Sequence, residues 1–292
     1  MKVLILGGTK FVGLKLISLL NDKNIDLYVA SRKKIKAQNF IFFDRKNLDD
    51  LNKLFIHNNF DVVVDFISYS SLDSKKLIDS LKKNNKEPKL IVISSTYVYS
   101  QPKKLISNSF FSENDFDSKT YSYSLDDRPK INYSDGKREM EAYLTNNYDN
   151  DNLVILRFPI ILGHNDYTGR THFYFNRLIN KKYLNPENIH SRSNYIFPYE
   201  ASLSIRNFVL NENFGIYNVA SDDISEYELI SIYCNFLKIS INDLVDEDLN
   251  FYESPFYLPF DFKIDSSKYN SIFKEKFNLE NSLVRELSKI KV

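Results

Sequence analysis

The chain has 292 residues, of which 43% are hydrophobic and 26% are charged, so it can bury a sizeable core and has the composition of a globular protein. Lysine and arginine number 39 against 38 for aspartate and glutamate, and a balance so close to neutral argues against a general nucleic-acid or membrane-surface binder. Cys234 is the only cysteine, which excludes an intramolecular disulfide and a thiolate metal cluster, so we expect no metal site.

The first predicted element is a strand over residues 3–6, a continuous apolar run typical of a strand buried on both faces of a parallel sheet. It ends at Gly7 and Gly8, and helical spacing begins a few residues later. A strand, a glycine turn and a helix N-terminus aim backbone N–H groups at one point, which is a geometry that binds phosphate. Gly7 and Gly13 fit the first and third positions of the dinucleotide fingerprint, while Lys10 stands where the middle glycine would be. An ordinary tight turn is the alternative, but its place at the start of a βαβ pattern favours cofactor binding.

Strand and helix signals then alternate through the first 160 residues, as in a doubly wound fold. The expected strands cover residues 26–31, 39–43, 61–67, 90–95 and 153–158, and the expected helices cover residues 48–55, 72–81 and 132–143. Between them, the polar stretch of residues 100–130 is expected to be one long loop. Loops of this length inside a compact domain are usually functional or locally disordered.

Beyond Pro159 the alternation weakens, and neither an internal repeat nor a low-complexity linker is visible. We expect helices over residues 171–178, 202–210, 225–237 and 280–290, with extended segments at 194–197 and 215–220. The predicted fold is therefore an α/β doubly wound parallel sheet of the Rossmann type over residues 1–162, with a smaller C-terminal substrate-binding lobe over residues 163–292. Segments around residues 194–220 are expected to return to the first domain.

Tyr133 and Lys137 stand at positions i and i+4, on the same face of one predicted helical turn. The ordinary pKa of tyrosine is about 10, so a tyrosine that acts as an acid or base near neutrality needs a cation nearby. Lys137 and an oxidised nicotinamide could supply that positive charge. The alternative is a partly buried tyrosine beside a solvated lysine, since the chain contains 20 tyrosines.

Two groups of polar residues directly follow predicted strands, at the edge of the sheet where ligands bind in open α/β folds. Ser95 and Thr96 could hydrogen-bond a substrate oxygen, or they could simply cap a turn. Arg32 and Lys33 follow the second strand, where an acidic residue would hold the ribose of NAD and basic residues suit the 2′-phosphate of NADP. We therefore expect NADP, with NAD as the alternative; a solvated charge run would have no such role.

Taken in order, these motifs resemble the extended short-chain dehydrogenase/reductase family, in its NAD-dependent epimerase/dehydratase group. The resemblance spans nearly the whole chain and rests on residues 7–13, Asp44, residues 94–99, Tyr133 with Lys137, residues 156–159 with Gly163, residues 215–220 and residues 265–268. The Gly-Gly-Thr-Lys-Phe-Val-Gly form is similar to an atypical branch, which includes bacterial sugar epimerase/reductase-like proteins and chloroplast stem-loop RNA-binding proteins. Residues 194–201 depart from the family, whose members often carry His-Val-Asp-Asp there.

The resemblance implies a role for each matching residue. Tyr133 would be the catalytic acid or base, Lys137 would hold the nicotinamide ribose and lower the pKa of the tyrosine, and Ser95 would orient the substrate oxygen with help from Thr96. The expected cofactor-binding residues are Gly7, Gly8, Thr9, Lys10, Phe11, Val12, Gly13, Ser31, Arg32, Lys33, Asp44, Tyr133, Lys137 and Phe158. The expected substrate-binding residues are Ser95, Tyr133, Arg170, Arg177 and Arg192, with Arg170 first for a substrate pyrophosphate and a surface ion pair as the alternative for each arginine.

We therefore expect an NAD(P)-dependent oxidoreductase or epimerase that acts on a nucleotide-activated sugar. Its most specific form is a reductase of a 4-keto-6-deoxyhexose nucleotide in surface-polysaccharide precursor synthesis, and a nucleotide-sugar epimerase is the alternative. A dehydratase is disfavoured, because Tyr97 stands where dehydratases normally have an acidic residue. An RNA-binding protein and a cofactor sensor are the rivals from other classes; the neutral charge counts against the first, and the intact Ser95, Tyr133 and Lys137 count against the second.

Location and assembly are further expectations. No apolar stretch approaches the ~18–20 residues of a membrane span, and the first residues lack the basic region, apolar run and cleavage site of a secretory signal. We therefore expect a cytoplasmic protein with no membrane contact. Since members of the family often pair through two helices, a homodimer is a further possibility.

Overall fold

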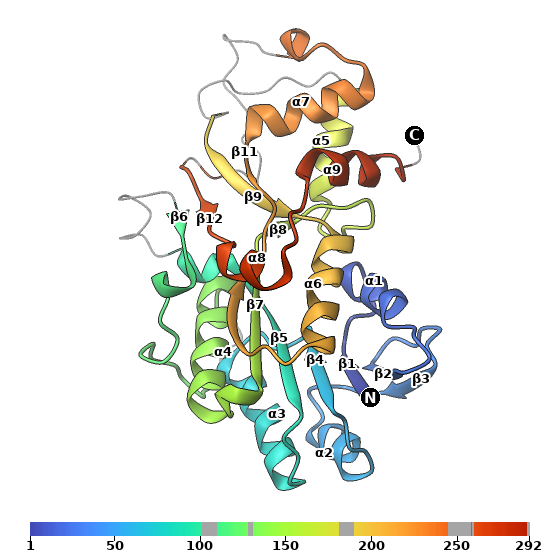
Figure 1. Ribbon diagram of the computed structural model, residues 1–292, viewed down its shortest axis with the longest axis vertical. Coiled ribbons are helices and arrows are strands. Elements are labelled where there is room, and N and C mark those ends of the chain that lie inside the picture. Colours follow the sequence, from blue (N-terminus) through green and yellow to red (C-terminus); the bar gives the residue numbers. More distant parts are fainter. Residues whose placement is uncertain (101–109, 128–130, 181–189, 245–257, 259, 291–292) are drawn as a thin grey trace.

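The computed structural model describes residues 1–100, 110–127, 131–180, 190–244, 258 and 260–290 (Figure 1). Its centre is a seven-stranded sheet in which every neighbouring pair runs parallel, in the order β10-β7-β5-β4-β1-β2-β3. The strands are β1 (Lys2–Leu6), β2 (Asp26–Ser31), β3 (Asn39–Phe42), β4 (Val62–Asp65), β5 (Lys89–Ser95), β7 (Leu153–Phe158) and β10 (Gly215–Asn218). The predicted doubly wound sheet is thus confirmed.

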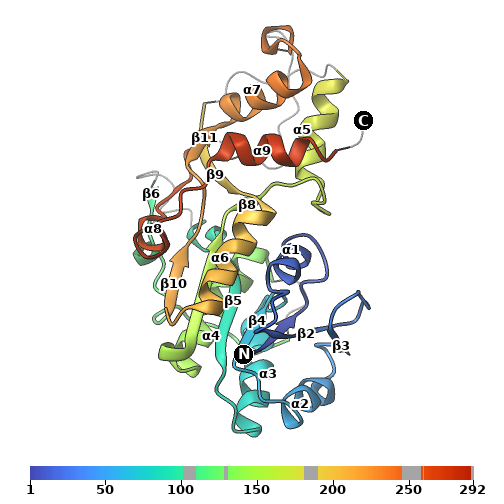
Figure 2. The ribbon, with the colours of Figure 1, turned by 45° about the vertical axis from the view of Figure 1, so that its right-hand side comes forward.

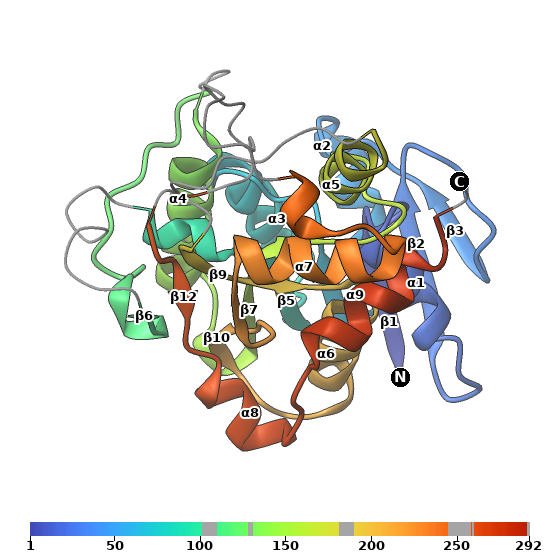
Figure 3. The ribbon, with the colours of Figure 1, turned by 90° about the horizontal axis from the view of Figure 1, so that it is seen from above.

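Helices cover both faces of this sheet (Figure 3). One face packs against α1 and α6, and the other against α2, α3 and α4, so each face has its own apolar core. The bounds are α1 (Val12–Leu19), α2 (Leu48–Ile56), α3 (Ser71–Lys83), α4 (Tyr133–Asn147) and α6 (Pro198–Leu210). The strand order reverses between β1 and β4, which creates the crevice at the carboxyl ends of the strands where such folds bind ligands.

A smaller lobe stands above that carboxyl edge (Figure 2). It contains a three-stranded sheet in the order β11-β9-β8 and a core between α5, α7 and α9. Its elements are β8 (Ile160–Ile161), α5 (Arg170–Ile179), β9 (Arg192–Ile196), β11 (Asp223–Ser225), α7 (Glu226–Leu237) and α9 (Leu279–Leu287). Between β9 and β11 the chain returns to the main sheet through α6 and β10, so the lobe and the sheet are interleaved along the sequence.

The remaining elements are short. A two-stranded sheet pairs β6 (Phe110–Phe111) with β12 (Lys263–Ile264), and α8 (Ser267–Phe273) packs beside β10. Helices of the 3-10 type cover Thr96–Tyr99, Glu113–Asp115, Asn150–Asn152 and Ile241–Leu244. In the parts of the chain described, no helix is both long enough and apolar enough to cross a membrane.

Two expectations about elements need correction. The strand predicted over residues 61–67 ends at Asp65, because the Asp65 carboxylate accepts the backbone N–H groups of Ile67 and Ser68 and turns the chain there. The stretch of residues 100–130 is not one plain loop, since it contains β6 and a 3-10 helix; its residues 101–109 and 128–130 lie outside the described residues.

A buried polar network ties the sheet to α4. Arg157 on β7 is fully buried, and its guanidinium lies 2.6 Å from the Glu141 carboxylate on α4. The same guanidinium donates to the Tyr99 hydroxyl at 2.7 Å, and that hydroxyl donates to the Asn218 side chain on β10 at 2.7 Å. Because the buried charges are paired and hydrogen-bonded, the network fixes α4 and the end of β10 relative to β7.

Candidate active site

The glycine turn after β1 has the backbone geometry that its sequence predicts. Gly7 and Gly8 have φ angles of 80° and 63°, in the left-handed region that disfavours side chains. Gly13 lies in the first turn of α1, and a Cβ atom there would lie 2.2 Å from the Gly8 Cα atom. The turn therefore holds the N-terminus of α1 at the carboxyl edge of the sheet, beside the crevice between β1 and β4.

The residues between these glycines point in different directions. Lys10 is exposed, and its Nζ atom lies 5.1 Å from the centre of the Tyr167 ring, on the loop between β8 and α5. Thr9 is half-buried, and Val12 is buried at the start of α1. Phe11 has a φ angle of 48°, which is uncommon for a residue with a side chain. Residues with such angles are often found at functional turns.

The ends of β2 and β3 lie at the same edge of the sheet. Ser31 is buried and donates to the Lys33 carbonyl at 2.7 Å, while Arg32 and Lys33 are exposed. Asp44 follows β3 and accepts the Lys46 N–H at 3.0 Å. These residues are placed where the adenosine half of a dinucleotide would lie, and none of residues 31–34 is acidic.

Tyr133 is the first residue of α4, where Asn132 caps the helix. Its side chain is 51% exposed, but the hydroxyl end points inward and hydrogen-bonds with Ser95. Burial raises the pKa of Tyr133 above its ordinary value, whereas the Ser95 hydrogen bond and the positive charge of Arg170 lower it. The structure therefore brings three of the predicted site residues together, from three different elements.

Lys137 lies one helical turn further along α4 and is 3% exposed. Its ammonium donates to the Ser68 carbonyl at 2.8 Å and to the Ile93 carbonyl at 2.7 Å. Burial lowers the pKa of Lys137 to about 8, while the Asp65 and Glu141 carboxylates oppose that change. The alternative of a solvated lysine beside Tyr133 is thus excluded, and the lysine is buried.

Ser95 and Thr96 follow β5 directly. Ser95 is buried, and its hydroxyl oxygen caps the next 3-10 helix by accepting the Tyr97 N–H at 3.2 Å. Thr96 is fully buried, and in the described part of the chain its hydroxyl has no hydrogen-bond partner. Phe158, at the end of β7, is the register partner of Ser95 and is buried in the core shared with α1 and α6.

The three predicted substrate arginines differ in their surroundings. Arg170 begins α5, and its positive charge lowers the pKa of both Tyr97 and Tyr133, so it faces the candidate site. Arg177 lies two turns along the same helix, with its guanidinium 5.9 Å from the Phe173 ring.

Arg192, on β9, differs from both. It is ion-paired with Asp223 at 2.5 Å and Glu228 at 2.9 Å, as in the surface ion-pair alternative.

Several residues around the site carry no sequence motif that would single them out. Asp65 is fully buried at the end of β4 and holds the Arg45 guanidinium at 3.0 Å, and the only hint was a charged residue closing an apolar run. Asp166 accepts the Thr168 N–H at 2.9 Å and the Arg170 N–H at 3.0 Å, which fixes the loop that presents Arg170. Tyr69, which contacts the Tyr133 ring, had no periodicity or spacing signal at all.

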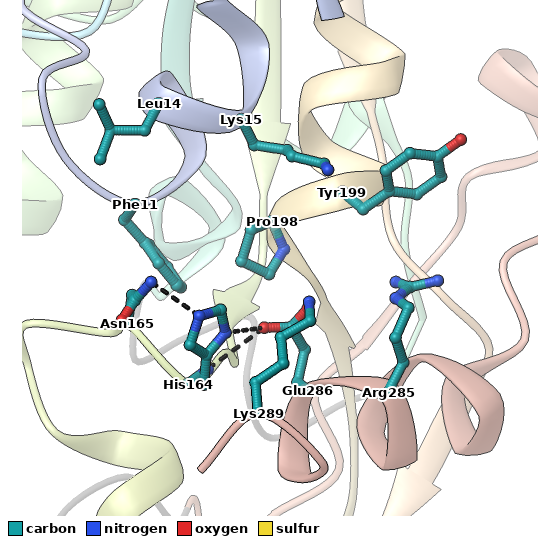
Figure 4. Close-up of a pocket in the computed structure, with 10 residues that line it drawn as sticks. All are labelled: Phe11, Leu14, Lys15, His164, Asn165, Pro198, Tyr199, Arg285, Glu286 and Lys289. Atoms are coloured by element: carbon teal, nitrogen blue, oxygen red, sulfur yellow. Dashed lines mark hydrogen bonds and ion pairs between the residues drawn. The ribbon is translucent and has the colours of Figure 1, made fainter. Parts of the chain in front are cut away.

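A separate pocket of about 660 Å³ shares only Phe11 with the predicted cofactor residues (Figure 4). It is lined by Phe11, Leu14, Lys15, His164, Asn165, Pro198, Tyr199, Arg285, Glu286 and Lys289. Its carboxylate, Glu286, is engaged by His164 at 2.7 Å and by Lys289 at 2.5 Å. Since the candidate catalytic residues lie elsewhere, we do not assign the reaction to this pocket. No cluster of potential metal ligands occurs among the described residues.

Comparisons with known proteins identify the family of the chain. The model of the NAD dependent epimerase/dehydratase family matches residues 3–191. No curated protein sequence matches the chain.

Solved structures similar to the chain include dTDP-glucose 4,6-dehydratase from Bacillus anthracis in complex with NAD, with 15% identity and a TM-score of 0.73 over 99% of this chain and 96% of that one. A dTDP-4-dehydrorhamnose reductase from Clostridium acetobutylicum has 15% identity and a TM-score of 0.71 over 99% of both chains. UDP-glucose 4-epimerase from Thermus thermophilus in complex with NAD has 15% identity and a TM-score of 0.70 over 100% of both chains. At 15% sequence identity, the similarity to these three structures establishes the fold.

Proposed function

Because the chain belongs to the NAD dependent epimerase/dehydratase family, we propose that it is a nicotinamide-dependent enzyme that modifies a nucleotide-activated sugar. The observation that carries the proposal is the convergence of Ser95, Tyr133 and Arg170 at the carboxyl edge of the sheet. Together these residues would supply a proton donor, a hydroxyl that can orient it and a positive charge at the edge where doubly wound folds bind their ligands.

The residues around the glycine turn fit a dinucleotide. Gly13 lets the first turn of α1 pack directly against the Gly8 backbone, since a Cβ atom there would lie 2.2 Å from the Gly8 Cα atom. Gly7 and Gly8 adopt left-handed φ angles, so the turn aims the N-terminus of α1 at the place where a phosphate would bind. The turn and the start of α1 would hold the pyrophosphate, and Asp44 would contact the adenine. A bound nicotinamide would supply or accept the hydride at a sugar carbon.

We take NAD as the leading cofactor and NADP as the alternative, which reverses the preference expressed by the sequence. Two of the similar structures, the B. anthracis dehydratase and the T. thermophilus epimerase, were solved with NAD. The case for NADP rests on Arg32 and Lys33, which are exposed at the end of β2 and have no acidic residue beside them in the sequence.

Tyr133 would give a proton to the sugar oxygen during reduction and take one during oxidation, while Ser95 holds that oxygen by a hydrogen bond. The pKa of Tyr133 is raised by burial, so the ionised form needs positive charge nearby. Arg170 supplies part of this charge. Lys137, one turn further along α4 and mostly protonated at neutral pH, would supply more.

For the substrate we propose a 4-keto-6-deoxyhexose nucleotide that is reduced, with Arg170 on its diphosphate and Arg177 behind it. The match to a dTDP-4-dehydrorhamnose reductase over almost the whole of both chains supports this choice. Epimerisation of a nucleotide sugar is the second candidate, supported by the match to the T. thermophilus epimerase over all of both chains. Both reactions would use the same tyrosine.

A thermal-shift screen with NAD, NADP and nucleoside-diphosphate sugars tests this proposal before any assay exists, since a ligand that binds only the folded state raises its stability. We expect a shift with one nicotinamide cofactor and a further shift when a nucleotide sugar is added. Net oxidation of NADH by a keto sugar would indicate the reductase, and sugar isomerisation without net oxidation the epimerase. Strong, steeply salt-dependent RNA affinity without any cofactor shift would contradict both.

A further inference from the structure

The Tyr69 ring contacts both members of the proposed catalytic pair. The Lys137 Nζ atom lies 4.8 Å from the centre of this ring, and the Tyr133 ring centre lies 6.2 Å from it. Both distances are within the range of attractive cation–aromatic and aromatic–aromatic contacts. Tyr69 follows β4, so it reaches Lys137 and Tyr133 on α4 from a different element.

Tyr69 is held in this place by its backbone. Its N–H donates to the Asp73 carboxylate at 3.0 Å, and the carbonyl of the preceding Ser68 accepts from Lys137. Gly136 stands between Tyr133 and Lys137 on α4, and a Cβ atom there would lie 2.5 Å from the Tyr69 carbonyl oxygen. A glycine inside a helix is otherwise unfavourable, so this one is explained by the close approach of Tyr69.

The Lys137 ammonium is contacted by polar groups on its other sides, and the Tyr69 ring lies on the remaining one. Two of its N–H groups go to backbone carbonyls, and the Met140 sulfur lies 3.7 Å away. The charged groups that act on it are Asp65, Glu141, Arg45 and Asp73, from β4, α4, the loop after β3 and α3. The remaining side is covered by the π face of Tyr69.

We propose that Tyr69 is a positioning residue for the active site, whose ring face holds the Lys137 ammonium in its charged form and fixes it beside Tyr133. The proposal rests on the proposed function in that Lys137 acts there as the charge that favours ionised Tyr133. It assigns the effect to the ring and not to the hydroxyl, so phenylalanine should replace tyrosine at this position and an aliphatic residue should not.

The test is a pH titration of Lys137 by NMR in the whole protein labelled with ¹³C-lysine, with its signal assigned by its disappearance in Lys137→Arg. In the wild type we expect a pKa of about 8, the value to which burial lowers it. In Tyr69→Phe it should stay within roughly 0.3 pH unit, and in Tyr69→Leu it should fall by about one pH unit, since the cation loses its aromatic partner.

Tyr199→Leu is the matched control, because Tyr199 also lies under a lysine, Lys15 at 5.4 Å, but outside the site. It should leave the Lys137 titration unchanged. An unchanged or raised pKa of Lys137 in Tyr69→Leu would overturn the proposal. The Tyr69 ring would then only exclude water from the ammonium and would not stabilise its charge. If Tyr69→Leu does not fold, Tyr69→Met provides the same comparison with a side chain that lacks a π face.

The titration needs no substrate, so it tests the role of Tyr69 separately from the proposed function. Once a substrate is known, the pH dependence of kcat should change in Tyr69→Leu and stay in place in Tyr69→Phe. A KM that rises with an unmoved kcat profile would instead mean that Tyr69 contacts a ligand directly, and it would count against positioning.

Discussion

Burial shifts the pKa of carboxylate and ammonium groups toward neutrality in different parts of the molecule. Lys137 falls to about 8 in the candidate active site, and Glu226 on α7 rises to about 7 in the lobe. Glu226 is 9% exposed and accepts one hydrogen bond from the Tyr174 hydroxyl, while its second oxygen has no partner in the described residues. A half-satisfied buried carboxyl is favoured in its neutral form.

Glu226→Gln should therefore stabilise the protein at alkaline pH. The folded pKa lies above the unfolded value, so the stability that the neutral carboxyl contributes is complete below about pH 4.5 and is lost as pH rises through about 7. A neutral glutamine avoids this loss, and we expect about 1–3 kcal/mol more stability than wild type near pH 9 and little difference near pH 5. Urea unfolding of both proteins at several pH values measures this difference in the free energy of unfolding.

Glu228→Gln is the control, because Glu228 lies on the same helix as Glu226 but its pKa is shifted in the opposite direction. The pKa of Glu228 is lowered by hydrogen bonds with Ser225 and by Arg192. Its charge stabilises the fold above the unfolded pKa, so the glutamine variant should be less stable at neutral pH. Equal effects of the two substitutions at all pH values would contradict this reading.

A single residue, Arg32, also tests the choice between NAD and NADP. If NAD is the cofactor, Arg32→Ala should change NAD affinity by less than about twofold, since an exposed arginine there faces no phosphate. Its NADP affinity should fall by roughly tenfold, because a charge-assisted contact with the 2′-phosphate is lost. Isothermal titration with both cofactors measures this, and a large loss of NAD affinity would place Arg32 elsewhere in the site.

At the level of elements, α4 carries the proposed pair of Tyr133 and Lys137, and the buried pair of Arg157 and Glu141 joins this helix to β7. Arg157→Met should destabilise the protein by about 3–5 kcal/mol, because it leaves the Glu141 carboxylate buried without its partner. The double variant with Glu141→Leu should recover much of this loss. A double-mutant cycle in urea measures the coupling, and additive effects would mean that the pair does not hold α4 to β7.

The sequence predicted the parallel sheet, its helices and the pair on α4, because these depend on local periodicity and on spacing within one turn. The residues it missed depend on contacts between distant segments. Tyr69 reaches α4 from the end of β4, and Asp65 pairs with Arg45 across strands. The burial of Lys137 could not be read from the sequence for the same reason, since the carbonyls that accept from its ammonium come from Ser68 and Ile93.

At the level of the whole molecule, the sheet and the lobe both contribute residues to the proposed site. The sheet contributes the glycine turn, Ser95 and α4, and the lobe contributes α5 with Arg170. Because the chain passes back from the lobe to the sheet through α6 and β10, the two parts are connected at several points. The division at residues 162 and 163 stays a prediction, as does the homodimer.

The most direct measurement compares wild type with Tyr133→Phe in NADH binding and in NADH oxidation by a nucleoside-diphosphate 4-keto-6-deoxyhexose. We predict that both proteins bind NADH with Kd values within about twofold, and that the variant loses about 10²–10⁴ in kcat, since only the proton donor is removed. Unchanged turnover in Tyr133→Phe, or no binding of any nicotinamide cofactor to the wild type, would contradict the proposed reaction.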